Sequence, residues 1–170
     1  MSLTTGIKDI KGDVMDELDG LDRSILAELQ RNARITVTDL AARVGLSKTP
    51  CQIRMRRLEG RGYILGYVAL VDSTKLGLSH IAFVQVTLSD TSSKALSAFN
   101  EGVRAIVEVE QCHMIAGAFD YLLKIRTADM PAYRSVLGEK VSTLPHVLQT
   151  STFAVMENVK DVETQLKNAP

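Results

Sequence analysis

Residues Thr36–Gly60 read TVTDLAARVGLSKTPCQIRMRRLEG, and this stretch decides the fold of the N-terminal part of the chain. Thr36 with Asp39 three residues later resembles a capping box, with Asp in place of the usual Glu, so a helix is expected to begin here. Gly45 ends that helix, because glycine adopts the left-handed conformation at little cost. Ser47 then caps a second helix, which carries Pro50 in its first turn and runs to about Gly60. Two short helices joined at a glycine predict a helix-turn-helix.

The flanking segments extend this motif to a winged domain over residues 18–71. Asp19 is a good N-cap for a preceding helix, whose apolar side chains recur at helical spacing: Leu21, Ile25, Leu26 and Leu29. After Gly62 the pattern becomes strand-like over residues 63–65 and 67–71, which predicts a two-stranded wing. Residues 1–17 are polar without a sustained period, so we expect a flexible tail.

The charge is unevenly distributed, although the formal net charge of the 170 residues is zero. The charged residues over 9–28 are mostly acidic, whereas residues 43–61 carry six bases against Glu59 alone: Arg43, Lys48, Arg54, Arg56, Arg57 and Arg61. Binding to phosphate depends on the local field more than on the net charge. A solvated basic helix face would produce the same pattern, so charge alone leaves both interpretations open.

The expected outward face of the 47–60 helix supplies the candidate DNA-binding residues. Residues placed about 100° apart bring Cys51, Met55 and Leu58 together as the buried edge. The candidates on the other faces are Ser47, Lys48, Thr49, Gln52, Ile53, Arg54, Arg56 and Arg57. A helix fits the major groove of double-stranded DNA, the predicted partner.

These side chains suit different parts of the duplex. Gln52 is suited to an adenine edge and Arg56 to a guanine edge, through bidentate contacts. Thr49 and Ile53 are suited to a thymine methyl group. We expect Lys48, Arg54 and Arg57 to meet phosphates, which set register rather than sequence. The helix N-terminus behind Ser47 adds N–H donors for a phosphate.

The second half of the chain has the order β-α-β-β-α-β, which predicts a ferredoxin-like domain and an α+β fold for the whole chain. The expected strands are 80–89, 109–116, 121–127 and 147–156, with helices over 93–105 and from Asp129 to Pro145. We expect a linker over 72–79, the domain over 80–157 and a C-terminal tail over 158–170. Neither face of the predicted sheet is cleanly polar, so a second copy of the chain is expected to cover one of them.

Other classes of protein find little support in the sequence. Cys112 and His113 are adjacent on a strand and therefore diverge, while His80 and His146 lack metal-ligand spacing. We expect no catalytic residue, metal or cofactor, and interpret Cys112 as a small core residue. Phe83 and Tyr121 lack the basic-aromatic pattern of RNA-binding sheets. With no disulfide framework, signal peptide or apolar run of ~20 residues, we expect a cytoplasmic protein without a membrane partner.

Long motifs in this order resemble the Lrp/AsnC family of transcriptional regulators. The motifs are Leu18–Leu26, Leu40–Ser47, Pro50-Cys51, Arg57-Leu58, Gly62–Ile64, Val109–His113 and Gly117–Lys124, and the resemblance covers about residues 18–160. It implies DNA binding by homodimers that assemble further, often into octamers. It also implies a C-terminal domain that binds amino acids and control of amino-acid metabolism. Within the family, the overall similarity is greatest to activators of proline dehydrogenase genes, which favours proline as effector.

The resemblance also implies an effector site at the turn after the second strand of the C-terminal domain. It maps onto Gly117, Ala118, Phe119, Asp120 and Tyr121. Gly117 leaves backbone groups open to a ligand carboxylate, and Asp120 can pair with an ammonium group.

Thr150 and Thr152 on the last strand would add hydroxyls to the site. Two further observations leave the assignment of this site open. Many members carry an acidic or polar residue where this chain has Ala118, which leaves the effector open. Gly and Asp are also common in ordinary hairpin turns, and the domain could assemble the protein without sensing anything.

Overall fold

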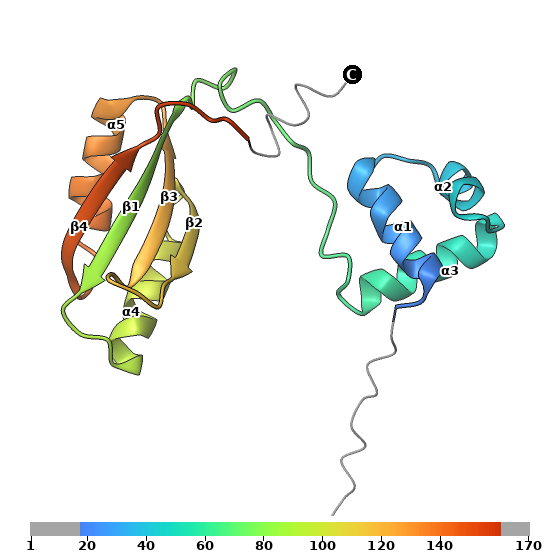
Figure 1. Ribbon diagram of the computed structural model, residues 1–170, viewed down its shortest axis with the longest axis horizontal. Helices are drawn as coiled ribbons and strands as arrows, with labels where there is room; N and C mark the ends of the chain where they lie inside the picture. The colour runs from blue at the N-terminus through green and yellow to red at the C-terminus, as the bar shows by residue number, and fades with distance from the viewer. Residues whose placement is uncertain (1–17, 161–170) are drawn as a thin grey trace, which may run out of the picture. The chain divides into compact units, whose positions relative to one another are not determined.

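The structure, a computed structural model, describes residues 18–160 and divides into two compact units at Ala69/Leu70 (Figure 1). The predicted tail over residues 1–17 lies outside the described residues, as does the part of the C-terminal tail after residue 160. Each unit has its own apolar core, and each is described by itself below.

Residues 18–69 of the N-terminal unit contain three helices, α1 (Gly20–Arg31), α2 (Val37–Val44) and α3 (Lys48–Gly60). The Asp19 carboxylate accepts the amide N–H of Asp22 at 2.8 Å, and the Thr36 hydroxyl accepts that of Asp39 at 3.1 Å, as predicted for two N-caps. Gly45 has a φ of 73° and ends α2 in the predicted left-handed conformation. The prediction for Ser47 was wrong in part, since it occupies the N-cap position of α3 but its hydroxyl makes no capping hydrogen bond.

Aliphatic side chains from all three helices form the core of this unit. The buried members are Ile25, Leu29, Leu40, Ala41, Val44, Cys51 and Leu58. Met55 packs against them from the predicted buried edge of α3. The burial of Cys51 and Leu58 turns the opposite side of α3 outward.

The predicted pair of wing strands is wrong. Residues 61–79 are described throughout and contain no strand, and Leu65 and Val68 are 96% and 79% exposed. The two predicted strands are separated by Gly66 alone, whereas even the tightest common β-hairpin needs a two-residue loop. The Tyr63 and Ile64 amides instead donate to the Leu58 carbonyl, which closes the end of α3.

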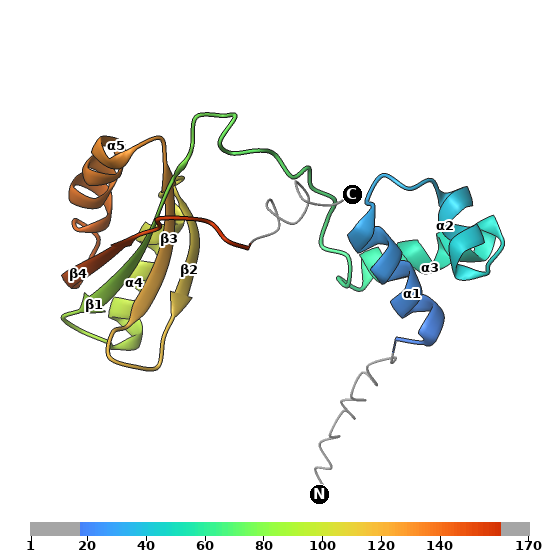
Figure 2. The ribbon, with the colours of Figure 1, turned by 45° about the horizontal axis from the view of Figure 1, so that its top comes forward.

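The C-terminal unit has the predicted β-α-β-β-α-β order (Figure 2). Its elements are β1 (His80–Leu88), α4 (Ser93–Arg104), β2 (Val109–Met114), β3 (Tyr121–Thr127), α5 (Met130–Ser135) with the following π-helical turn η1 (Val136–Val141), and β4 (Val147–Ala154). The strands form one antiparallel sheet in the order β2-β3-β1-β4, as in a ferredoxin-like fold.

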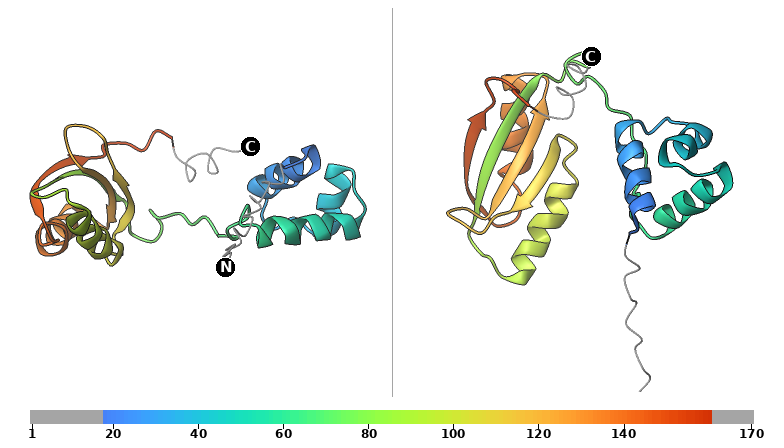
Figure 3. Two further views of the ribbon diagram at one scale, coloured as in Figure 1. Left: turned by 90° about the horizontal axis from the view of Figure 1, so that it is seen from below. Right: turned by 45° about the vertical axis from the view of Figure 1, so that its right-hand side comes forward.

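Both helices of this unit cover the same face of the sheet (Figure 3). The register pairs Val84 with Leu123 and Val86 with Tyr121, and these four side chains are buried under the helices. Phe99 of α4 is buried among them. The other face carries the alternate positions of each strand, and no helix within residues 70–160 covers it.

The prediction of one regular helix from Asp129 to Pro145 was wrong in its second half. Asp129 caps α5 as expected, but after Ser135 the backbone widens into η1, and the Ser142 amide donates to the Leu137 carbonyl at 2.8 Å. Val136 and Val141 are both buried although they lie five residues apart. A wider turn brings such a pair onto one face, which the 3.6-residue period of an α-helix does not.

Gly45→Ala tests the predicted turn between α2 and α3. No atom would clash with the added Cβ, so the cost is the left-handed backbone alone, about 1–2 kcal/mol of unfolding free energy. Gly60→Ala is the matched control, because its surroundings are equally open and its φ is not positive. Urea unfolding checks both, and equal stability of the two variants would contradict this account of the turn.

Candidate functional site

The outward face of α3 gathers six of the eight side chains predicted to contact DNA. All six are exposed, namely Ser47, Lys48, Thr49, Gln52, Ile53 and Arg56. Ile53 is 62% exposed although it is apolar, and no core residue covers it. A helix face that combines an amide, a guanidinium and an exposed aliphatic group has the chemistry needed to read base edges and thymine methyl groups.

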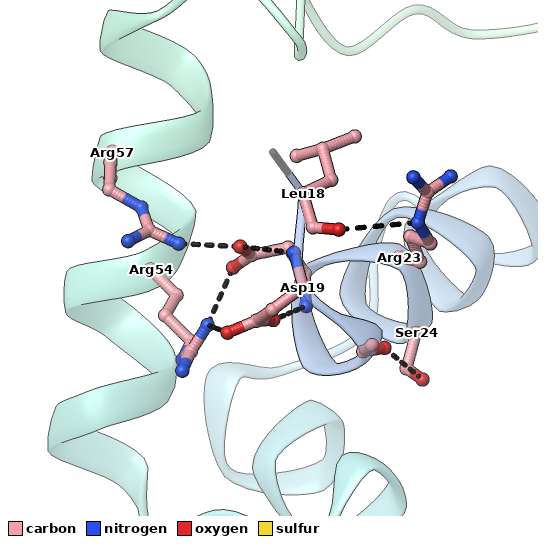
Figure 4. A network of polar contacts seen from close by, with 8 residues as sticks. Leu18, Asp19, Arg23, Ser24, Arg54 and Arg57 are labelled. Atoms are coloured by element: carbon pink, nitrogen blue, oxygen red, sulfur yellow. Dashed lines mark hydrogen bonds and ion pairs between the residues drawn. The ribbon is translucent and has the colours of Figure 1, made fainter. Parts of the chain in front are cut away.

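The other two predicted residues, Arg54 and Arg57, point toward the start of α1 (Figure 4). Arg54 Nη1 lies 2.6 Å from Asp19 Oδ2 and 2.8 Å from Asp22 Oδ1. Arg57 Nη2 lies 2.5 Å from Asp22 Oδ2. Asp22 is only 1% exposed, and each of its carboxylate oxygens is bound by an arginine of α3. Contact of these two arginines with phosphates stays a prediction, and it would have to compete with these ion pairs.

Asp19, the predicted N-cap of α1, also binds an arginine of α3, and sequence reasoning missed this second role. Asp19 accepts the Asp22 amide and also binds Arg54. The pKa of Asp19 is therefore lowered, first by the Asp22 amide and then by Arg54. The signal was present in the sequence, because residues three apart share one side of a helix or its cap. Asp19 and Asp22 have this spacing, and so do Arg54 and Arg57.

The acids of the described part of the acidic segment, Asp19, Asp22 and Glu28, all form ion pairs with arginines of the basic segment. Glu28 of α1 lies 2.9 Å from Arg43 of α2 and 2.8 Å from Arg31. The pKa of Glu28 is lowered, chiefly by its hydrogen bond to Arg43. The positive charge on the outward face of α3 therefore comes from Lys48 and Arg56, which form no ion pair within the described part of the chain.

In the C-terminal unit, the predicted effector turn is anchored to β1 through Asp120. Its Oδ2 accepts the Leu88 amide at 2.7 Å, and its own amide donates to the Val86 carbonyl at 3.0 Å. Gly117 and Ala118 are exposed, and Phe119 is half-buried. Asp120 thus has a structural partner, while the adjoining backbone at Gly117 and Ala118 faces solvent.

The seven predicted effector residues do not form one cluster. Thr152 is bonded to the Tyr133 hydroxyl at 2.5 Å, beside α5. Thr150 pairs with Val86, which pairs with Tyr121, so two strand spacings, about 10 Å, separate Thr150 from Tyr121. Tyr121 is 2% exposed, and its ring lies 4.4 Å from that of Phe99, under α4.

A pocket of about 230 Å³ opens beside the effector turn, between α4 and the strands β2 and β3. It is lined by Asn100, Val103, Arg104, Cys112, Met114 and Tyr121. Of the predicted effector residues, only Tyr121 lies in it. Met114 and Tyr121 are register partners at the ends of β2 and β3, immediately before and after the segment that carries the turn.

The remaining candidate chemistry is limited. Cys112 packs against the core and His113 is exposed, so the two side chains diverge as predicted. Across residues 18–160, no three His, Cys, Asp or Glu side chains are grouped to hold a metal. None of the helices in this range has the length and apolar character required to cross a bilayer.

Two family profiles match the chain. Residues 18–64 match a winged helix-turn-helix DNA-binding family, and residues 81–164 match the Lrp/AsnC ligand binding domain. The first ends at Ile64, shortly after α3, and contains the whole outward face of that helix. The second contains the turn, the pocket and the sheet.

Curated relatives match over nearly their whole length. The proline dehydrogenase transcriptional activator of Rhizobium radiobacter is 60% identical over 146 residues, which cover 86% of this chain and 94% of the relative. The protein of the same name from Rhodobacter capsulatus is 55% identical over 85% of this chain and 94% of its own. The leucine-responsive regulatory protein of Escherichia coli K12 is 48% identical over 85% of this chain and 88% of its own. All three are regulators rather than enzymes by name, as the sequence predicted for this chain.

Solved structures of transcriptional regulators also superpose on most of the chain. An AsnC family transcriptional regulator from Agrobacterium tumefaciens superposes with a TM-score of 0.80 at 34% identity, covering 84% of this chain and 93% of its own. A transcriptional regulator from Neisseria meningitidis, solved as a complex with L-methionine, has a TM-score of 0.80 at 32% identity, covering 85% and 94%.

Asp22→Ala tests the network between α1 and α3. We expect a loss of about 1.5–3 kcal/mol of unfolding free energy, the range for hydrogen bonds to charged groups, because Arg54 and Arg57 are partly exposed and regain water. Thermal unfolding measures it. Glu28→Gln is the matched control at the exposed pairs, where we expect a change within about 0.5 kcal/mol. Equal effects of the two substitutions would refute the central position of Asp22.

Proposed function

Because this chain belongs to the Lrp/AsnC family of transcriptional regulators, we propose that it reads a specific DNA sequence with the outward face of α3 and responds to an amino acid bound by its C-terminal unit. The family binds DNA and responds to amino acids. The observation that carries the finer proposal is that the polar side chains of α3 fall into an exposed group and a group bound to α1. Gln52 and Arg56 are exposed, while Arg54 and Arg57 are bound to Asp22.

In this proposal the two groups of α3 residues act differently. Gln52 and Arg56 contact base edges, and Thr49 and Ile53 contact thymine methyl groups. Lys48 and the α3 N-terminus behind Ser47 bind phosphates. Arg54 and Arg57 hold α3 against α1 and so fix the angle at which the outward face enters the groove.

We propose proline as the effector, and control of proline breakdown as the role. Support comes from the names of the two relatives at 60% and 55% identity. Other relatives are named for leucine or were solved with methionine, so the effector varies within the family. The exposed backbone at Gly117 and Ala118 would bind the ligand carboxylate, and Asp120 would bind its ammonium group while holding the Leu88 amide.

The chain is proposed to act as a homodimer that assembles further, with the octamer as the favoured form. The sheet face without a helix in the C-terminal unit carries Phe83, Leu122 and Phe153, beside a charged cluster in which Glu110 binds Lys124 and Arg126. Burial would raise the pKa of Glu110, but the two cations outweigh burial and lower it. An apolar face of this kind is stabilised by a second copy.

A dimer would place two α3 helices in successive major grooves. Their separation would be about one turn of DNA, ~34 Å, on a pseudo-palindrome. The cytoplasmic location predicted from the sequence is part of the same proposal.

Replacing Gln52 or Arg56 by Ala should relax base preference and weaken specific binding by about 1–3 kcal/mol for each bidentate pairing with a base that the substitution removes. Binding to unrelated DNA should change little for Gln52→Ala. The measurement is fluorescence anisotropy on the operator and on single-base variants of it. Arg34→Ala, at an exposed position between α1 and α2, is the control for removal of a positive charge. If base preference is unchanged in both test variants, the outward face of α3 is not the reading surface.

Two substitutions of Asp120 separate its two proposed roles. Asp120→Asn keeps an oxygen for the Leu88 amide but removes the charge, so stability should hold while effector affinity falls by about tenfold or more. Asp120→Ala should lose both effector affinity and about 1–3 kcal/mol of stability. Calorimetric titration with L-proline and thermal unfolding measure the two quantities. An unchanged effector affinity in Asp120→Asn would reduce Asp120 to a turn anchor.

A further inference from the structure

The pocket between α4 and the edge strand β2 contains an unsatisfied polar group. The hydroxyl of Tyr121 is buried and completes no hydrogen bond among the described residues. Burial raises the pKa of Tyr121, and the nearby Asn100 side chain offsets part of that rise without completing a hydrogen bond to the hydroxyl. Buried hydroxyls nearly always have a partner, because an unpaired one has lost its water without replacement. The residue is only 2% exposed, and its ring is fixed against Phe99, so the hydroxyl cannot turn outward to solvent.

The other lining residues supply a cation and an apolar wall. Val103, Cys112 and Met114 give the pocket an aliphatic and sulfur-containing surface, and Asn100 adds an amide. Arg104 is exposed at the pocket and forms no ion pair within residues 18–160. No acidic side chain lines the pocket, so its charge is positive. At about 230 Å³ the pocket falls just below the ~300–1,000 Å³ of typical ligand sites, which restricts it to small molecules.

We propose that this pocket is a binding site, complete within one subunit, for a small carboxylate with a short apolar body. The carboxylate binds the Arg104 guanidinium, and the apolar body lies against Val103 and Met114. A polar atom of the ligand or an accompanying water satisfies the Tyr121 hydroxyl beside Asn100. The pocket shares only Tyr121 with the proposed effector residues, and its other lining residues come from α4 and β2.

Arg104 also has a structural explanation that the test has to separate from binding. It is the last residue of α4, where a cation is favourable whether or not a ligand is present. Arg134 is the matched control, because it is the basic residue in the last turn of α5 and is exposed away from the pocket. Arg104→Gln and Arg134→Gln therefore remove the same charge from exposed positions on the two helices of this unit, and only the first alters the pocket.

Cys112 provides the readout, because its thiol lines the pocket while Cys51 lies fully buried in the other unit. The full-length protein, without DNA, is alkylated with iodoacetamide, and the rate at each cysteine is followed by peptide mass spectrometry. The probe is 4-methylpentanoate, and its neutral counterpart of the same shape is 4-methylpentanamide. Burial raises the pKa of the Cys112 thiol, which Arg104 partly offsets, so each variant is compared with itself with and without probe.

The acid should slow alkylation of Cys112 saturably, by about tenfold once its concentration reaches roughly ten times its Kd. The amide should give little protection, and the rate at Cys51 should not change. Arg104→Gln should abolish protection, whereas Arg134→Gln should retain it. Tyr121→Phe should weaken protection without lowering the melting temperature of the unliganded protein, since it removes an unsatisfied hydroxyl.

Three results would overturn the proposal. These are no protection by the acid, equal protection by the acid and the amide, or full protection in Arg104→Gln. No DNA or effector response enters the measurement, so its failure leaves the proposed function standing.

Discussion

The buried carboxylate of Asp22 is the contact on which the N-terminal unit depends. A carboxylate that is 1% exposed is stable only if it is bound on both oxygens, and here Arg54 binds one and Arg57 the other. Both arginines belong to α3, so the same contact fixes the orientation of that helix relative to α1. Cys51 and Leu58 bury the inner side of α3. The side chains left outward, including Gln52 and Arg56, are therefore presented by a helix whose position is set from two directions.

Much of this architecture follows from local sequence signals. Asp19, Thr36 and Gly45 each mark a helix end by a mechanism that needs only neighbouring residues, and all three occupy the predicted positions. Strand alternation also gave the four strands of the C-terminal unit to within two residues. What failed depended on geometry over a longer range. The predicted wing strands needed a hairpin that Gly66 alone does not allow. The π-helical turn at Val136–Val141 was missed because the apolar spacing of Tyr133, Leu137, Val141 and Leu144 fits an α-helix.

The candidate sites were predictable to different degrees. Exposure on α3 followed from the helical period, but the partners of Arg54 and Arg57 did not, because Asp19 and Asp22 lie more than 30 residues away in the sequence. For the effector turn, the sequence grouped Thr150 and Thr152 with Gly117–Tyr121. The register instead puts Thr150 two strands from Tyr121, and Thr152 is bonded to Tyr133. The pocket lined by Arg104, Cys112 and Tyr121 had no sequence signal, since its residues come from three elements that only the folded sheet brings together.

The central claim, that the outward face of α3 reads DNA sequence, is tested most directly by fluorescence-anisotropy titration of the full-length protein. The two DNA duplexes are one from upstream of its own gene and a scrambled duplex of the same composition, each at several salt concentrations. The account predicts tighter binding to the upstream DNA by a factor of about 10³ or more, together with affinity for both duplexes that falls as salt rises. Equal affinity for the two duplexes at every salt concentration would contradict it, because α3 would then contribute charge without recognition.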